Sequence, residues 1–325
     1  MKLHEDKIVF QQAIRMTAEK MQIADIYVEK DYWICYALHL IYNSDVKDYV
    51  IFKGGTALSK CFDIIERFSE DIDLVLLKKE AESDNQLKTK LRKVSKVLIA
   101  PFVEEEMEGI TNKMGMIRKV AYNYPKIHKG NFGQVRDHLI LEASWLGSFE
   151  PYSMKQIATY IYDMMQDNNQ QGLAEQYGMK PFDVLVLDVR RTLCEKIMSL
   201  VRFSHTETPI EDLNNKVRHI YDIHQLLQKS EVKAFFVSED FEDMLIKVAN
   251  DDKLSFRSKN EWLEIHPKEA IIFKNPEITW VQLEKVYRND FGKLVYGELP
   301  KEDSILETLM IVSKRLQSIN WNLKL

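Results

Sequence analysis

Short apolar runs alternate with longer helical patterns in the first half of the chain. Apolar residues recur with the period of a helix over residues 5–43, with an interruption near Ile23 to Tyr27. The charged segment 80–108 also has a helical pattern. Turn residues bound several runs that are typical of strands, at residues 49–52, 71–77, 117–124 and 137–145. We therefore expect one mixed β-sheet flanked by helices.

The pattern changes in the second half. From Pro151 onward the strand signals fade, and long helical patterns follow at residues 192–203, 210–228 and 304–319. A chain of 325 residues exceeds the usual size of one compact core. We place a boundary near residue 150, with an α/β lobe over 1–150 and a helical lobe over 151–325 that closes a cleft. The expected fold class is α+β.

The stretch ERFSEDIDLVLL, Glu66 to Leu77, places two aspartates inside an apolar strand. Residues two apart on a strand project from the same face, so Asp71 and Asp73 lie together, roughly 7 Å apart. Two neighbouring carboxylates repel each other and lose hydration, and a divalent cation between them removes this cost. Oxygen ligands suit Mg²⁺ or Mn²⁺. The alternative is an edge strand whose aspartates face water.

A Gly-Gly turn precedes this strand by one helix. Gly54, Gly55 and Thr56 follow a short apolar strand and open the next predicted helix. Glycines let the backbone approach a phosphate closely, a helix N-terminus offers unpaired N–H groups, and Thr56 can add a hydroxyl contact. A lone Gly-Gly pair is usually only a tight turn. Beside Asp71 and Asp73 it predicts a nucleoside triphosphate site, in which the glycines hold phosphates and the aspartates hold the metal.

A third carboxylate commonly completes two-metal phosphoryl transfer. Glu142, in HLILEASW, interrupts an apolar strand that can lie beside the strand of Asp71 and Asp73. It is the leading candidate for a third metal ligand, and Asp137 is a weaker rival. The alternative is that Glu142 is a strand glutamate that faces solvent.

The Gly-Gly turn, helix and D-x-D strand together resemble the nucleotidyltransferase superfamily of the DNA polymerase β type. The longer stretch FKGGTALSKCFDIIERFSEDIDL is similar to the AbiEii/AbiGii toxin family of nucleotidyltransferases, found in toxin–antitoxin and phage-abortive systems. Further similar segments follow in the order of the family and span nearly the whole chain. They are VEKDYWICYAL upstream, RRTLCEKIMSL at 190–200, RHIYDIHQLL at 218–227, and FGKLVYGELP near the end.

The resemblance implies further site residues. Lys196 matches the motif lysine of the family, Asp222 its late aspartate, and Ser69 the serine before the metal aspartates. Arg191 belongs to the same motif as Lys196 and is a further candidate for nucleotide binding. The residues alone support these roles more weakly: a lysine can place a charge on a phosphate, whereas Asp222 could simply form an i,i+4 ion pair with Arg218. Asp222 could orient either the acceptor or the lysine.

The implied activity is transfer of a nucleoside monophosphate from an NTP to a hydroxyl acceptor, with Mg²⁺ or Mn²⁺ and release of pyrophosphate. The resemblance also implies the toxin of an AbiE-type system, a cognate antitoxin, and RNA, such as the 3′ end of tRNA, as acceptor. One alternative is a nucleotide- or protein-binding module that has kept the fold and lost catalysis. Another is transfer to a protein or small molecule. Retention of both aspartates, both glycines and the lysine favours an enzyme.

The composition of the chain limits which classes of partner and which cellular compartment we expect. A net charge of −5 excludes a protein that is basic throughout, so an RNA acceptor needs a local basic surface. Three cysteines, far apart and without a C-x-x-C pair, are expected to be free thiols in a reducing cytoplasm. No run of 18 apolar residues occurs, so we expect no membrane span. The candidates for an RNA surface lie near the predicted hairpin: Lys113, Arg118, Lys119, Lys126, Lys129 and Arg136.

Overall fold

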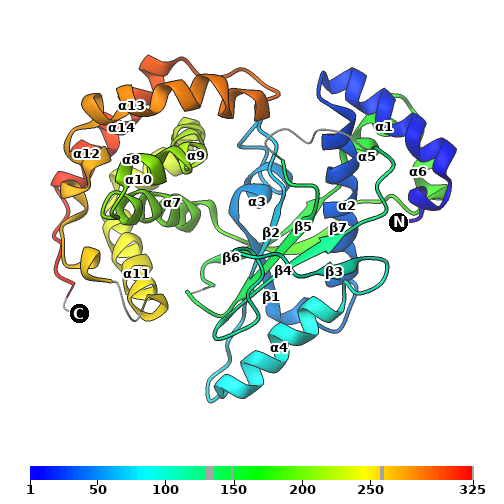
Figure 1. Ribbon diagram of the computed structural model, residues 1–325, viewed down its shortest axis with the longest axis horizontal. Helices are drawn as coiled ribbons and strands as arrows, with labels where there is room; N and C mark the ends of the chain where they lie inside the picture. Colours follow the sequence, from blue (N-terminus) through cyan, green and yellow to red (C-terminus); the bar gives the residue numbers. More distant parts are fainter. Residues whose placement is uncertain (129–134, 148, 257–259, 324–325) are drawn as a thin grey trace. The chain divides into compact units, whose positions relative to one another are not determined.

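The computed structural model describes residues 1–128, 135–147, 149–256 and 260–323. These residues form two compact units, which are coloured along the sequence in Figure 1. The first unit carries a β-sheet and the second is helical, so the expected α+β class is confirmed. The first unit comprises Met1–Asp63, Phe68–Trp145 and Tyr152–Val186, and the second comprises Ile64–Arg67, Leu146–Pro151 and Leu187–Leu325.

A seven-stranded mixed sheet with the order β3-β4-β5-β2-β1-β7-β6 organises the first unit. β1 is antiparallel to β2 and parallel to β7, whereas β5 is parallel to β2 and antiparallel to β4. The four strands expected from the sequence are all present in it. The strands are β1 (Val50–Lys53), β2 (Asp71–Leu76), β3 (Val103–Glu105), β4 (Ile117–Asn123), β5 (Leu139–Ser144), β6 (Tyr152–Ile157) and β7 (Phe182–Leu187).

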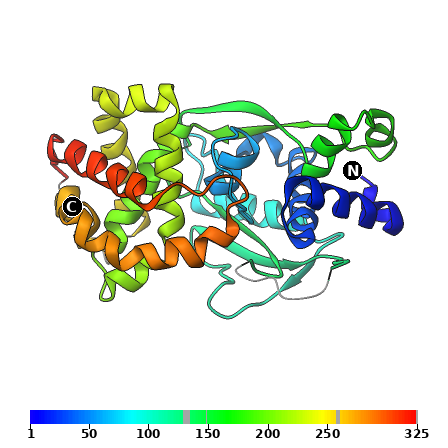
Figure 2. The ribbon, with the colours of Figure 1, turned by 90° about the horizontal axis from the view of Figure 1, so that it is seen from above.

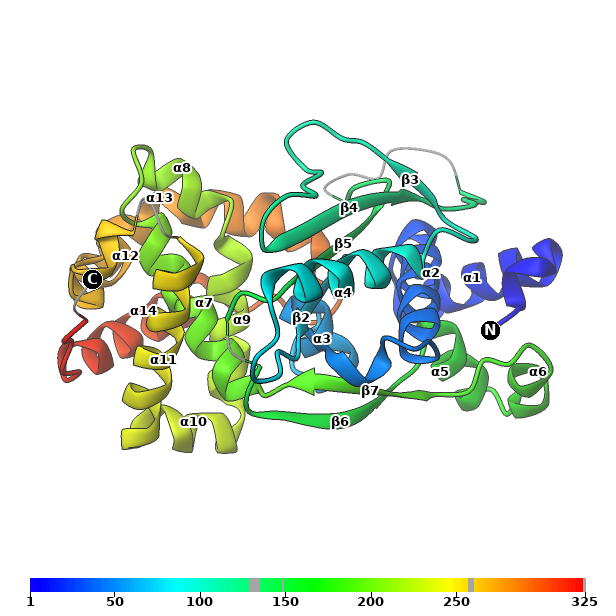
Figure 3. The same ribbon diagram turned by 90° about the horizontal axis from the view of Figure 1, so that it is seen from below.

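One face of this sheet carries the hydrophobic core of the unit. Leu74, Tyr122 and Leu141 project from that face and are buried in a single core cluster. Helix α4 (Asp84–Lys96) crosses the same face, as Figure 3 shows, and the Tyr122 hydroxyl donates to the carbonyl of Ser95 at 2.7 Å. Because side chains alternate along a strand, Asp73 and its neighbours in register project from the opposite face.

Side chains cap several helices of the first unit. The Asp6 carboxylate accepts the Val9 N–H, and Ser83 with Gln86 forms a capping box before α4. Gln22 adopts a left-handed conformation after α1 and separates it from α2, near the predicted interruption. The helices are α1 (Lys7–Met21), α2 (Asp25–Tyr42), α3 (Gly54–Lys60), α4, α5 (Tyr160–Asp167) and α6 (Gln171–Gln176), with the short 3-10 helices η1 (Leu3–Glu5) and η2 (Lys47–Tyr49).

Three strands correct the sequence-based prediction. β6 and β7 lie beyond Pro151, so the expectation that strands cease there is wrong. β3 also lies within the segment 80–108 that was expected to be helical throughout. β3 and β6 are edge strands, and the side chains of β6 are mostly exposed, so neither carries the apolar alternation of a half-buried strand. β7 has a buried apolar pattern, FDVLVL, which the sequence analysis overlooked.

Helices make up the second unit. The predicted helix 210–228 is divided in two near Asn215. Figure 2 shows α13 and α14 side by side in orange and red. The helices are α7 (Val189–Phe203), α8 (Pro209–Asn214), α9 (Val217–Gln228), α10 (Ser230–Val237), α11 (Glu239–Ser255), α12 (Ile271–Lys274), α13 (Pro276–Asn289) and α14 (Glu302–Gln317), with the 3-10 helices η3 (Glu261–Leu263), η4 (Pro267–Glu269) and η5 (Phe291–Leu294).

Two further expectations concern the whole chain. Cys35, Cys61 and Cys194 are free thiols, as their spacing predicts. Among the described helices, none combines the length and the apolar character that crossing a bilayer requires.

Candidate active site

A row of charged side chains crosses four neighbouring strands of the sheet. In the strand register, Lys119 of β4 lies opposite Glu142 of β5, Glu142 lies opposite Asp73 of β2, and Asp73 lies opposite Lys53 of β1. Asp71 is two residues before Asp73 and projects from the same face. The fold therefore brings the two predicted metal aspartates and Glu142 to one face of the sheet.

The Gly-Gly turn lies against this row. Gly54 has a φ of +83°, a conformation that favours glycine, and a Cβ added there would lie 2.4 Å from Oδ2 of Asp73. Only glycine therefore allows the turn to approach the Asp73 carboxylate so closely. The structure brings the Gly54-Gly55 turn and the D-x-D strand together, as the sequence predicts.

Thr56 and Ser69 fix the start of β2. The buried Thr56 hydroxyl donates to the carbonyl of Asp71 at 2.6 Å, and its oxygen lies 3.1 Å from the Ser69 hydroxyl. A hydroxyl has only one proton to donate. The Thr56 hydroxyl donates it to the protein backbone rather than to a phosphate oxygen. Both residues thus position the strand that carries Asp71 and Asp73.

The electrostatics of Asp73 are those of an incomplete site. The side chain keeps some exposed surface but is closely surrounded by protein atoms. This desolvation, with the negative charges of Asp71 and Glu142, raises the pKa of Asp73 from 3.8 to about 7, against the weaker opposing effect of Lys53 and Lys119. Additional positive charge, such as a bound cation, would therefore favour the ionised form of Asp73.

The residues fit a hard divalent cation. Asp71 and Asp73 offer oxygen donors only, and Mg²⁺ is usually bound by one or two carboxylates together with substrate phosphates and water. Among the described residues, no group of three or more His, Cys, Asp or Glu side chains is arranged to hold a metal. Glu142 instead pairs with Lys119 at 2.9 Å, so its role as a third ligand stays a prediction. The weaker rival, Asp137, precedes β5 and has a half-exposed side chain.

A buried network that the sequence analysis missed supports Asp71. The Glu70 carboxylate accepts hydrogen bonds from the Lys30 ammonium and from the backbone N–H of Arg136. The Arg136 guanidinium in turn lies 3.2 Å from Oδ1 of Asp71. Lys30 and Glu70 are both buried. Lys30 lies in a helix that the sequence predicts to be largely buried, and a charge there was an available signal because a buried charge requires a partner. Glu70 directly precedes Asp71 in a polar stretch and gave no such signal.

Lys196 and Asp222 meet in the second unit. The Lys196 ammonium donates to Oδ2 of the fully buried Asp222 at 2.6 Å. Arg67 forms a bidentate pair with the same carboxylate, at 2.7 and 2.8 Å. The alternative pair with Arg218 is therefore not what holds Asp222. Although burial disfavours its charged form, Arg67 and Lys196 hold the pKa of Asp222 well below its ordinary value.

The segment that contains Arg67 connects several of the family-like stretches. Residues 64–67 belong to the second unit, and Asp71 follows Arg67 by only four positions in the sequence. The Glu66 carbonyl accepts the Tyr296 N–H at 2.9 Å, and the Tyr221 hydroxyl accepts the Glu66 N–H at 3.2 Å. The stretches FGKLVYGELP and RHIYDIHQLL thus both hold the chain just before the D-x-D strand.

Arg191 and most of the predicted acceptor surface have other partners. Arg191 is buried and pairs with Glu195 and Asp251 in the second unit. The six basic residues expected to form one acceptor surface do not all share a face. Lys119, Lys126 and Arg136 each pair with a carboxylate, Arg118 projects from the opposite face to Lys119, and Lys129 lies outside the described residues.

Comparison with known proteins identifies the family. A model of the family described as nucleotidyl transferase AbiEii toxin, type IV TA system, matches residues 38–308. The chain belongs to this family. It is therefore a nucleotidyltransferase of the toxin–antitoxin class, with an NTP as substrate and an antitoxin as partner. The family resemblance drawn from the sequence is confirmed.

The fold of this AbiEii family member is similar to that of one solved nucleotidyltransferase toxin. MenT4, a nucleotidyltransferase toxin from Mycobacterium tuberculosis H37Rv, matches with a TM-score of 0.58 and 14% identity, over 94% of this chain and 90% of that chain. JHP933 from Helicobacter pylori matches with a TM-score of 0.44 and 15% identity, over 89% of this chain and 93% of that chain. No curated protein matches the sequence.

Proposed function

We propose that the protein uses Mg²⁺ or Mn²⁺, bound by Asp71 and Asp73, to transfer a nucleoside monophosphate from an NTP to a hydroxyl group of RNA. The observation that carries this proposal is the position of Asp73. It lies between Glu142 and Lys53 in the strand register and against Gly54, with a raised pKa that a bound cation would reverse. When bound, the metal would neutralise phosphate charge and orient the NTP.

The neighbouring residues take separate roles in this proposal. The backbone of Gly54 and Gly55 approaches the phosphates, and Glu142 is the candidate for a further metal ligand. Thr56 and Ser69 position Asp71 through the hydrogen bonds that join them to the start of β2.

Two residues of the second unit also have roles in this proposal. Lys196 is the candidate for a positive charge on the nucleotide, and Asp222 orients its ammonium. Arg191, a further candidate for nucleotide binding, is buried and pairs with Glu195 and Asp251.

The RNA acceptor, and the tRNA 3′ end in particular, rests on the family resemblance. The decisive experiment incubates the purified protein with each α-labelled NTP, Mg²⁺, and total cellular RNA and protein, and then separates the labelled products on a gel. We expect Mg²⁺-dependent label on small RNA, release of pyrophosphate, and loss of both in Asp73→Asn.

The same experiment separates the alternatives. Label on a protein or a small molecule would show that the acceptor is wrong while the transfer chemistry is right. Metal-dependent NTP binding without pyrophosphate release would overturn the enzymatic proposal in favour of a binding module.

A further inference from the structure

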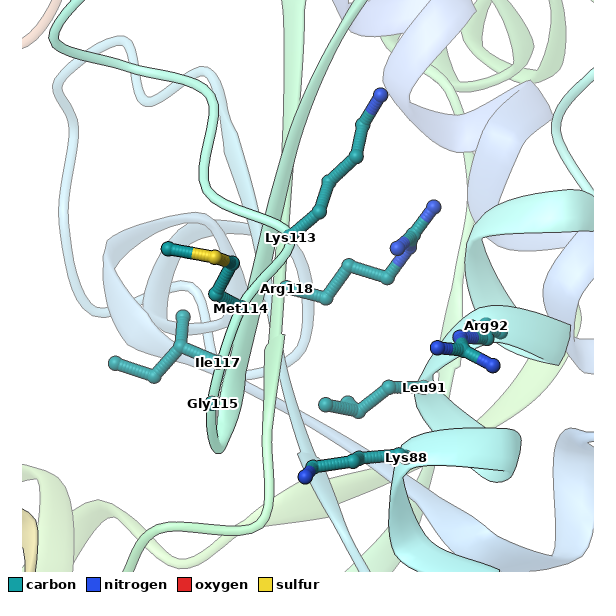
Figure 4. A pocket seen from close by; sticks show the side chains of 8 residues that line it. All are labelled: Lys88, Leu91, Arg92, Lys113, Met114, Gly115, Ile117 and Arg118. Carbon is teal, nitrogen blue, oxygen red and sulfur yellow. The ribbon is translucent and has the colours of Figure 1, made fainter. Parts of the chain in front are cut away.

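A basic pocket lies on the core side of the sheet, away from the acidic row. It has a volume of about 250 Å³ and is formed by α4 and by the segment that leads into β4. Figure 4 shows side chains extending from α4 toward this segment. Four of its lining residues are basic and none is acidic: Lys88 and Arg92 from α4, and Lys113 and Arg118 from the facing segment.

The charges of this pocket are only partly compensated. Lys113 pairs with Glu104, and Arg118 donates to the neutral hydroxyl of Ser95 at 2.5 Å. Among the described residues, no carboxylate lies within salt-bridge distance of Lys88 or Arg92. These two cations are four residues apart on one helix face, an arrangement that weakens a helix unless an anion binds between them. The pocket thus carries a net positive charge.

The surrounding surface favours a long anion over a small one. α4 carries five basic residues and one acidic residue, in a chain whose net charge is −5. Its exposed cations continue beyond the pocket through Lys93 and Lys96. A small phosphate ester would use the pocket alone, whereas a polynucleotide would also follow the helix, because its phosphates repeat along the strand. The exposed Met114 and the half-buried Ile117 add apolar surface on which a sugar or base can pack.

The pocket is separate from the acidic row but close to the same sheet edge. Arg118 and Lys119 are consecutive on β4, so Arg118 projects toward α4 while Lys119 projects toward Glu142. β3 pairs with the 121–123 end of β4, and among the described residues Asn112 borders Lys119 through an isolated bridge. The pocket and the acidic row therefore meet β4 at consecutive residues on its two faces.

We infer that this pocket binds backbone phosphates of the RNA acceptor and holds the acceptor at a point remote from the reacting hydroxyl. The inference rests on the proposed function for the identity of the acceptor. The binding of RNA to the pocket does not depend on the proposed function, because it requires neither NTP nor metal. The contact reads charge and not base sequence, because the phosphates are the groups that Lys88, Arg92 and Arg118 can neutralise.

The test removes two charges from the pocket and compares the result with a matched loss elsewhere. The double variant Lys88→Gln with Arg92→Gln changes two exposed residues and relieves their mutual repulsion, so its melting temperature should equal or slightly exceed that of the wild type. The control, Lys2→Gln with Lys7→Gln, removes two exposed charges beside α1 of the same unit. Binding of fluorescently labelled bulk tRNA is measured by anisotropy over a range of salt, with no NTP and with the metal chelated.

The pocket variant should weaken tRNA binding on the order of tenfold at low salt and lower the slope of log affinity against log salt by about 1.5. The control should change neither quantity, and Mg²⁺-dependent NTP binding should be equal in all three proteins. A wild-type affinity in the pocket variant, or an equal loss in the control, would overturn the inference.

Competition identifies the occupant. Inorganic tripolyphosphate is tested with the metal chelated. Tight binding to the wild type with weak binding to the pocket variant, and displacement of tRNA from the wild type over the same concentration range, would show a small-anion pocket and overturn the polynucleotide assignment. A protein that binds tRNA through the pocket but never labels RNA would refute the proposed function and leave the pocket in place. Labelling of RNA without any role for Lys88 and Arg92 would support the proposed function and overturn the inference about the pocket.

Discussion

Two aspartates in enclosed positions, one in each unit, behave in opposite ways. Asp73 lies among Asp71 and Glu142, and its pKa is raised to about 7. Asp222 is fully buried between Arg67 and Lys196, and its pKa is held well below the ordinary value. Burial disfavours ionisation in both cases, so the difference lies in the charges that surround each group. The protein supplies two cations to Asp222, whereas acidic neighbours outweigh the basic ones around Asp73.

The largest effect on stability is expected at Asp222. Asp222→Asn removes the anion shared by Arg67 and Lys196 and should lower the free energy of unfolding by about 3–5 kcal/mol, as for other broken buried ion pairs. Chemical denaturation measures this loss. Arg218→Gln, which changes the cation one helical turn away, is the control and should leave stability unchanged. Equal losses in the two variants would mean that the contrast between the aspartates has been misread.

The largest effect on activity is expected at Asp73. Asp73→Asn keeps the shape of the side chain and removes one anionic ligand, so transfer should fall on the order of 10³-fold or more, or about 4 kcal/mol in the barrier. Stability without metal should be unchanged or higher, because repulsion by Asp71 and Glu142 is relieved. Pyrophosphate release and melting temperature are measured on the same preparation. Near-normal turnover would remove Asp73 from the metal site.

Lys196 joins the two halves of the comparison, since it is both buried and a candidate for the nucleotide. Lys196→Ala should slow transfer on the order of 10²-fold, the scale of a lost electrostatic stabiliser. It should also cost about 1–3 kcal/mol of stability through the lost charged hydrogen bond to Asp222. Single-turnover kinetics and denaturation separate the two effects. Full activity at reduced stability would leave Lys196 with a structural role alone.

Gly54 tests how closely Asp73 is packed. Gly54→Ala must accommodate a positive φ, which costs about 1–2 kcal/mol, and must displace the Asp73 carboxylate. We expect both lower stability and weaker Mg²⁺-dependent activity. Gly172→Ala in α6 is the matched control, because a Cβ there meets nothing within 4 Å, and it should be neutral or slightly stabilising. Activity retained in Gly54→Ala would show that the carboxylate can move without consequence.

The smallest effect is a difference in pH dependence. With metal chelated, folded Asp73 still holds a proton at pH values where the unfolded chain has released it, so its contribution to stability is lost as the pH rises toward 7 and beyond. Asp73→Asn should therefore gain a few degrees in melting temperature relative to the wild type between about pH 5 and about pH 8. Asp222 has the opposite sign, because its contribution is lost only as the pH falls. A constant difference across this range would contradict the raised pKa.

Much of the site could be read from the sequence because it depends on local geometry. The alternation of a strand places Asp71 and Asp73 on one face, and a positive φ selects glycine at the turn beside them. The strand of Glu142 could be found by its apolar pattern. Edge strands such as β6 could not, because their side chains are exposed and their pairing depends on the neighbouring strand rather than on their own residues.

The sequence alone determined the fold class, the D-x-D strand, the Gly-Gly turn and the family to which the chain belongs. The tertiary structure decided which charges meet: that Arg67 rather than Arg218 holds Asp222, that Lys119 pairs with Glu142, and that Arg118 turns toward α4. The physical reason is that dihedral preferences and side-chain periodicity act between near neighbours. Ion pairs depend on distances between residues that are remote in the chain, and only packing sets those distances.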